Sequence, residues 1–194
     1  MGRRIFPSSH EALGANRFGL WLFLAALAIL FAGALLAMLA IRLETEDWPS
    51  DLPPLPSLLW WSTGVLIAST AMIQLAVLKW RRQERDAGRR LLILALALSI
   101  AFLVLQVLAW HEWTTAFQIA SPPLETHRMA QTGFLVLIGL HGAHIIGGLI
   151  PLSLVVWYAA VRGTATSALD SVAIYWHFLD AIWLVLVVFM LLVL

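Results

Sequence analysis

The sequence lacks cysteine altogether and has few charged residues. Of its 194 residues, 12% are charged and 61% are apolar. Without cysteine, neither a disulfide framework nor a metal site with thiolate ligands is available to the chain. Too little charge and too much apolar surface exclude an ordinary water-soluble domain. The composition therefore predicts an integral membrane protein.

Sequence signatures of covalent and nucleotide chemistry are also missing. There is no phosphate-cradling glycine loop, no nucleophile elbow and no dinucleotide fingerprint, and many glycines fall inside apolar stretches. We therefore expect no catalysis by this chain alone, no cofactor bound to it and no nucleic-acid partner.

Long apolar stretches are what the sequence has in abundance. A helix needs about 20 apolar residues to cross a hydrocarbon core of about 30 Å. Five stretches meet that length, at about residues 18–41, 58–78, 91–110, 132–158 and 172–194. The first is too long for the core of a signal peptide, so we expect it to be retained. The prediction is an all-α fold, a single five-helix transmembrane domain over residues 18–194, preceded by a cytoplasmic segment, residues 1–17.

Charged residues divide between the two sides of this predicted bundle. Basic residues gather on one side, at Arg3, Arg4 and Arg17, in the Lys79–Arg90 loop and at Arg162. Acidic residues dominate one loop on the other side, at Glu44, Glu46, Asp47 and Asp51. Short loops rich in arginine and lysine stay on the cytoplasmic side. We therefore expect the N-terminus inside and the C-terminus outside.

Two histidines lie within the fourth apolar stretch, in "GLHGAHIIGG". His141 and His144 are three residues apart and so share one face of a helix. One interpretation is a metal or haem site. The other is polar packing across a close helix contact, which small residues permit; the small residues here are Gly139, Gly142, Gly147 and Gly148. No further histidine-rich motif accompanies the pair, so we favour polar packing and expect no metal.

The last stretch carries an imidazole and a carboxyl group at membrane depth, in "YWHFLDAIW". His177 and Asp180 again share one helix face. A buried carboxylate and an imidazole can offset the cost of each other's burial. The alternative is a proton relay, because intramembrane acids often serve one. The first two helices offer only Gln74 and a few hydroxyls to such a relay, so we favour the structural pair.

Other polar residues lie near the predicted helix ends. Gln106, His111 and Glu112, in "LQVLAWHEW", are candidates for a polar cluster at the outer interface. Arg162, at the inner end of the fourth helix, is a candidate ligand for an anionic lipid headgroup, because a guanidinium contacts phosphate well. An equally good interpretation is that Arg162 binds no specific lipid and is only one of the basic residues that keep this side in the cytoplasm.

Taken together, "YWHFLDAIWLVL", "GLHGAHIIGG", "LVLQVLAWHEW" and "RFGLWLFLAALAILFAG" resemble subunit III of haem-copper oxidases in its short five-helix form. The resemblance implies a non-catalytic subunit of the bacterial cytoplasmic membrane that supports assembly and stability during turnover. Haem and copper would then lie in partner subunits, with a subunit I-like catalytic protein as a neighbour and phospholipid bound between helices. His141, His144, His177 and Asp180 match the family's intramembrane polar positions.

The chain departs from that family at two places. Leu27 and Ala109 stand where many relatives carry acidic residues. The resemblance therefore does not by itself imply a proton-antenna role that depends on those carboxylates, and that role stays open. Two alternatives stay open: an accessory subunit of a nitric oxide reductase, and a small proton-coupled transporter. Within the oxidase interpretation, the electron donor is either cytochrome c or a quinol.

Overall fold

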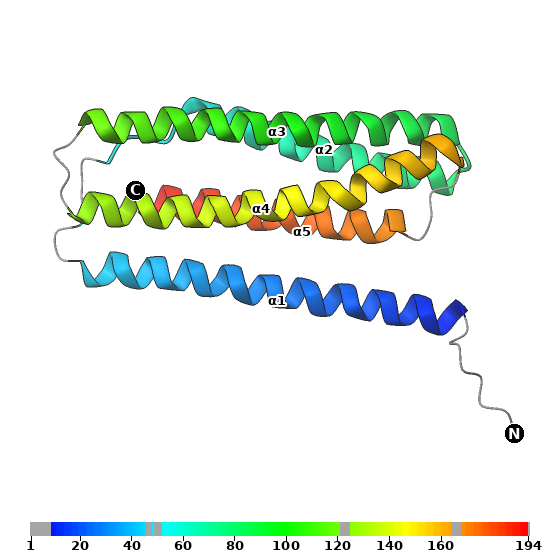
Figure 1. Ribbon diagram of the computed structural model, residues 1–194, viewed down its shortest axis with the longest axis horizontal. Helices are drawn as coiled ribbons and strands as arrows, with labels where there is room; N and C mark the ends of the chain where they lie inside the picture. The colour runs from blue at the N-terminus through cyan, green and yellow to red at the C-terminus, as the bar shows by residue number, and fades with distance from the viewer. Residues whose placement is uncertain (1–8, 46–47, 49–51, 121–124, 164–167, 194) are drawn as a thin grey trace, which may run out of the picture.

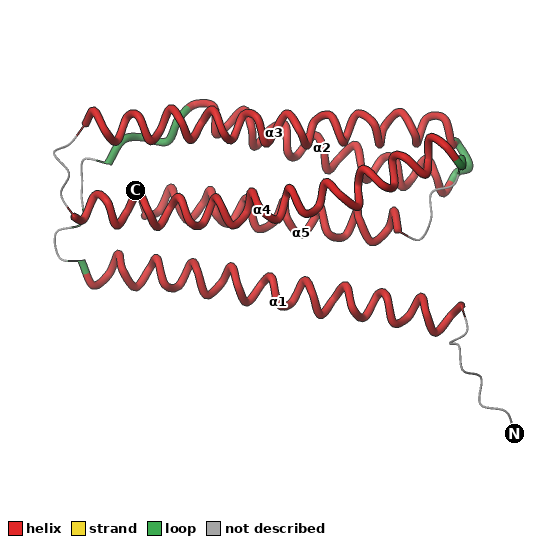
Figure 2. Tube along the Cα trace, in the orientation of Figure 1, coloured by secondary structure: helices red, strands yellow, loops and turns green. Residues whose placement is uncertain are grey.

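The computed structural model describes residues 9–45, 48, 52–120, 125–163 and 168–193, and the fold over them is all-helical (Figures 1 and 2). Its helices are α1 (Ser9–Glu44), α2 (Ser57–Arg81), α3 (Arg85–Ala120), α4 (Glu125–Val161) and α5 (Ala168–Val193). All five are long and apolar enough to cross a membrane. The predicted all-α fold with five helices capable of spanning a membrane is confirmed.

Three of the helices are considerably longer than the sequence predicts. The chain from residue 111 to residue 131 was expected to be a loop, yet α3 continues to Ala120 and α4 already begins at Glu125. At about 1.5 Å per residue, the 36 residues of α3 extend about 54 Å, well beyond a hydrocarbon core of about 30 Å. Apolar length therefore marks only the part of a helix that crosses the membrane. The polar turns beyond it stay helical because no proline or glycine interrupts residues 111–120.

Helices α2, α3, α4 and α5 form a closed ring, and α1 lies outside it. Each member of the ring packs against the next, and α5 closes the ring against α2. Among the described residues, helix α1 packs against α4 and α5 and not against α2 or α3, and in Figure 1 it runs along the edge of the bundle. The interface between α2 and α5 therefore lies on the opposite side of the ring from the interface between α3 and α4.

The most extensive contact joins α2 and α3. Only the short loop Arg82–Glu84 separates the two helices (Figure 2). Within it, Gln83 adopts a left-handed conformation with φ of 62°. Further along, the hydroxyl of Ser69 lies 2.8 Å from that of Ser99 and donates to the Ala95 carbonyl at 3.0 Å. Small hydroxyl side chains let two membrane helices approach closely and bond to each other. The predicted loop over residues 79–90 is therefore a tight helical hairpin.

Helices α4 and α5 meet at a glycine. A Cβ atom added to Gly148 would lie 2.6 Å from the ring of Tyr175, which leaves no room for a side chain. The Tyr175 hydroxyl donates a hydrogen bond of 2.8 Å to the backbone carbonyl of His144. Two of the residues that fill the centre of the bundle, Trp176 and Trp183, are completely buried on α5. Close approach at Gly148 brings these large rings into the core.

The connection between α1 and α2 is tied to the ends of other helices by two indoles. Trp48 donates to the Val193 carbonyl at the end of α5, and Trp113 on α3 donates to the Pro53 carbonyl, each at 3.2 Å. The Trp113 side chain is buried. These bonds satisfy two indole N–H groups at the end of the bundle where the C-terminus lies (Figure 1).

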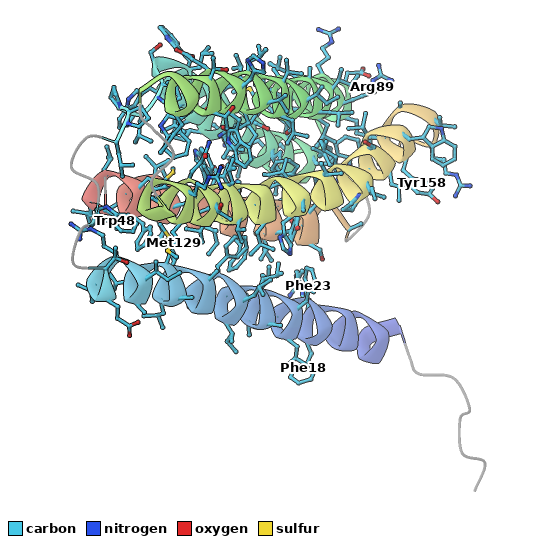
Figure 3. All side chains as sticks on the ribbon, turned by 60° about the vertical axis from the view of Figure 1, so that its left-hand side comes forward. Phe18, Phe23, Trp48, Arg89, Met129 and Tyr158 are labelled. Carbon is cyan, nitrogen blue, oxygen red and sulfur yellow. The ribbon has the colours of Figure 1, made fainter. Side chains whose placement is uncertain are left out.

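The opposite end of the bundle is rich in arginine. Figure 3 shows Arg89 and Tyr158 at this end, far from Trp48 and Met129. An ion pair of 3.1 Å between Arg81 and Asp170 joins α2 to α5 there. This segregation agrees with the division of charge in the sequence, and the orientation in the membrane stays a prediction.

Candidate functional site

His141 lies in the centre of the bundle among aromatic rings. Its side chain is 1% exposed, and its ring stacks on Trp183 with centroids 5.0 Å apart. The rings of Phe102 and Phe31 approach its edges at 6.2 and 6.3 Å. Neither ring nitrogen has a hydrogen-bond partner among the described residues. A buried imidazole without a partner is costly and calls for an explanation.

The sequence led us to expect a hydrogen bond from His144 to another helix. The described residues show no such bond for His144. Its Nδ1 atom lies 2.7 Å from the Leu140 carbonyl, one turn earlier in the same helix, and its ring approaches Phe31. The expectation was wrong for a geometric reason. Gly142 and Gly147 face open space rather than a neighbouring helix, and only Gly148 makes the close contact.

The predicted pair of His177 and Asp180 is replaced by contacts to α2. The Nε2 atom of His177 lies 3.0 Å from the side-chain oxygen of Gln74, and both residues are exposed on the outside of the ring. The Oδ1 atom of Asp180 is buried, and no residue that the structure describes hydrogen-bonds to it. Thr70 of α2 lies near this carboxyl group, although the two do not reach hydrogen-bonding geometry. Sequence spacing showed a shared helix face, but it could not show that α2 supplies the neighbours.

The predicted cluster of Gln106, His111 and Glu112 does not form. Gln106 is 7% exposed and points into the bundle, whereas His111 and Glu112 are exposed beyond it on α3. The reason is helical geometry, because residues five and six positions apart lie on different faces. Gln106, the buried residue of the three, instead lines a pocket together with His141.

A pocket of about 340 Å³ lies between α3 and α4, and three of the side chains that line it carry enclosed polar atoms without partners among the described residues. Gln106, Trp110 and His141 line it together with Phe102, Gly139 and Gly142. Both amide atoms of Gln106 and the indole nitrogen of Trp110 have no hydrogen-bond partner among the described residues. The sequence analysis did not single out Trp110 as a site residue. The only signal was its spacing of four residues from Gln106, which places both on one helix face.

Arg162 is exposed at the arginine-rich end of α4. Its guanidinium lies 5.0 Å above the ring of Tyr158, one turn earlier. This cation–π contact holds the side chain near the end of the helix. The described part of the chain gives Arg162 no ion pair and contains no group of three or more histidine, cysteine, aspartate or glutamate side chains that could hold a metal.

Comparison with known proteins identifies the family. Residues 10–193 match the family model described as Cytochrome c oxidase subunit III. Cytochrome c oxidase subunit 3 of Alkalihalophilus pseudofirmus is 31% identical over 91% of this chain and 86% of its own length. Cytochrome bo(3) ubiquinol oxidase subunit 3 of Pseudomonas aeruginosa is 25% identical over 91% and 84%. A probable quinol oxidase subunit 3 of Staphylococcus haemolyticus is 27% identical over 87% and 84%. The chain therefore belongs to the cytochrome c oxidase subunit III family.

Proposed function

We propose that this chain is the non-catalytic subunit III of a respiratory haem-copper oxidase in a bacterial cytoplasmic membrane. Its match to subunit III over nearly the whole chain supports this function. The relatives include subunits of both cytochrome c and quinol oxidases, so the donor is left open. These matches do not support the two alternatives, a nitric oxide reductase subunit and a proton-coupled transporter. The proposal keeps the N-terminal segment, residues 1–17, in the cytoplasm and residues 18–194 as one transmembrane domain.

The geometry that best supports a docking role is the polar pair outside the ring. His177 and Gln74 are exposed near the middle of α5 and in the inner half of α2. Polar side chains at such a depth rarely face lipid, because hydrocarbon offers them no hydrogen-bond partner. A helix of the catalytic subunit or of another oxidase subunit can supply those partners. We therefore propose that the docking surface is the outer face of the interface between α2 and α5, around His177, Gln74 and Asp180.

A double variant, Gln74→Leu with His177→Leu, tests this docking surface through two effects of opposite sign. The isolated subunit should be unchanged or more stable, since polar groups leave a lipid-facing surface. Its association with the remaining subunits should weaken by about tenfold, as expected for losing one or two hydrogen bonds between membrane helices. Thermal unfolding of the isolated chain and co-purification of tagged partner subunits measure the two effects. Unchanged co-purification would place the docking surface elsewhere.

Asp180 supplies the matched control for the same surface. Asp180→Asn keeps a hydrogen-bonding group beside Thr70, whereas Asp180→Leu removes it. Assembly should therefore suffer more from leucine than from asparagine. Loss of proton-coupled turnover in an intact Asp180→Asn complex would instead indicate a relay.

Bound phospholipid is the second part of the proposal, and two apolar grooves beside α1 support it. One groove, of about 480 Å³, lies between α1 and α4 and includes Ala34 and Val136. The other, of about 320 Å³, is lined by residues of α1, α4 and α5 and includes Leu20 and Pro151. Both have almost entirely apolar walls, which suit acyl chains. Arg162 is the proposed contact for an anionic headgroup.

Arg162→Ala should weaken retention of anionic phospholipid by about tenfold, because a charge-assisted contact to phosphate is lost. Phospholipid extracted from the detergent-purified complex and measured by mass spectrometry gives the result. Arg89→Ala is the matched control, since Arg89 lies at the same end of the bundle but pairs with Asp86 at 3.1 Å. Equal phospholipid retention in both variants would show that Arg162 makes no specific contact with a headgroup.

A further inference from the structure

The groove between α1 and α4 is open because small residues line it. Ala34 and Ala37 belong to its α1 wall, and Gly133 belongs to its α4 wall. The two helices touch at Gly133, where an added Cβ atom would strike the Met38 side chain. Around this contact the small side chains leave a space of about 480 Å³, which is large enough to hold part of a lipid.

The length of this groove matches one leaflet of a bilayer. Its α4 wall extends from Arg128 to Leu137, and over that interval a helix rises about 14 Å. Half of a hydrocarbon core of about 30 Å is about 15 Å. The groove therefore suits a chain that belongs to a single leaflet.

An arginine lies where the groove reaches the end of the bundle. Arg128 lines the groove, is exposed, and lies near the start of α4. Met129, which also lines the groove, lies at the same end of the bundle as Trp48 in Figure 3. This end is the outer one in the predicted orientation. An apolar groove that ends at an exposed guanidinium matches the two parts of a phospholipid, an acyl chain and a phosphate.

A second guanidinium is held at the same end by α1. Arg42 follows Met38, a groove residue, by four positions, so both lie on one side of the helix. Its guanidinium lies 5.0 Å from the centre of the Trp48 ring, and that indole donates a hydrogen bond of 3.2 Å to the Val193 carbonyl. A guanidinium stacked on a ring keeps N–H groups free at its edge. Arg42 is therefore held in place with donors available for a phosphate.

The rule that basic residues stay on the cytoplasmic side does not account for these two arginines. Arg42 and Arg128 lie at the end of the bundle opposite to the arginine-rich end. No ion pair joins either of them to another residue that the structure describes. Glu44 is also exposed at this end, so the surface is not broadly positive. A local contact of both guanidinium groups with one phosphate explains their position.

We propose that the groove between α1 and α4 binds a phospholipid of the outer leaflet, with an acyl chain in the groove and the phosphate at Arg128 and Arg42. Arg162 cannot serve this lipid, because α4 rises about 36 Å from Leu137 to Val161. The proposal rests on the proposed binding of phospholipid. It adds a second site with its own residues in the opposite leaflet.

Binding is measured by photolabelling the full-length chain, stripped of lipid in detergent. The probe is a phosphatidylglycerol that carries a diazirine in one acyl chain, so its phosphate is its only charged group. Labelling of the parent should be saturable, and mass spectrometry of peptides should find the label near Ala34 and Val136, which line the groove. A diacylglycerol with the same chains should compete about tenfold less well than phosphatidylglycerol, because it lacks the charged contact. Inorganic phosphate, which has no chain, should not compete.

Arg128→Ala should weaken this labelling about tenfold, because a charge-assisted contact to phosphate is lost. Thermal unfolding should not change, since the side chain is exposed and has no ion pair among the described residues. Arg89→Ala is the matched control. Arg89 lies at the other end of the bundle and pairs with Asp86, so this variant should label as the parent does.

Ala37→Phe tests the same site by filling the groove. Ala37 is exposed and lines the groove, so an aromatic ring there should block labelling. Ala40→Phe is the control, because Ala40 is an exposed alanine of the same helix that does not line the groove. It should label as the parent does.

Three results would overturn the proposal. They are parent-like labelling of Arg128→Ala or Ala37→Phe, competition by diacylglycerol as strong as by phosphatidylglycerol, and a label confined to positions outside the groove. A failure here leaves the proposed assembly intact, because co-purification of partner subunits measures assembly. It also leaves the Arg162 site intact, because that site is tested by its own variant.

Discussion

Replacing Gly148 by leucine is expected to separate α4 from α5 and to lower the free energy of unfolding by about 2–4 kcal/mol. A Cβ atom at this position would lie 2.6 Å from the Tyr175 ring and 3.7 Å from Trp176, so the new side chain has no space. Moving the ring also breaks the hydrogen bond from Tyr175 to the His144 carbonyl. Unfolding of the isolated chain in mixed micelles, followed by circular dichroism, measures the loss.

Gly147→Leu is the matched control for this prediction. It makes the same change one residue earlier in the same helix, where no atom lies within 4 Å of an added Cβ. Its stability should stay close to that of the parent. Equal destabilisation of both variants would show that the cost comes from leucine in this part of α4 and not from the contact with Tyr175.

Deleting the whole subunit is expected to leave the initial rate of substrate reduction intact but to shorten the active life of the oxidase. We expect the redox centres in partner subunits, so chemistry should survive the loss. The docking surface on the partner would be uncovered, however, and a loss on the order of 1.4 kcal/mol in the barrier to inactivation shortens the lifetime about tenfold. Oxygen uptake followed from the first turnovers to complete inactivation separates the two quantities.

Adding back the purified chain should restore the lifetime, and the Gln74→Leu with His177→Leu variant should restore it less well. An immediate loss of initial rate on deletion, with haem content unchanged, would contradict the non-catalytic assignment. So would a lifetime that does not depend on the subunit.

The sequence predicted the five helices because membrane crossing depends on apolar length, which is visible in one dimension. It predicted the end of α3 and the start of α4 poorly. The polar residues after Trp110 and before Thr132 have a composition that fits an exposed helix and a loop equally well. The low hydropathy of "HEWTTAFQ" suits either state. The lack of proline and glycine there permits a helix without requiring one, and the structure shows that α3 continues.

The polar residues could be found from the sequence, but their partners could not. His177, Asp180, His141 and Gln106 stand out because each is polar within an apolar stretch. Which helix faces each of them depends on the order of helices around the ring, and spacing along one helix carries no such information. The contact of His177 with Gln74, 103 positions away, and the shared pocket of Gln106 and His141 are results of that order.

The position of α1 has a consequence for biosynthesis. Helix α1 is made before the other four helices, yet its packing partners among the described residues, α4 and α5, follow α2 and α3. Until they arrive, α1 has to persist as a single helix in lipid, and its long apolar sequence allows this because each membrane helix can be stable before it associates. The tight hairpin of α2 and α3 needs no later segment and can form while the ribosome is still at work. The docking of α1 is therefore completed only after α5 is made, so a truncated product that lacks α5 would hold its first helix by α4 alone.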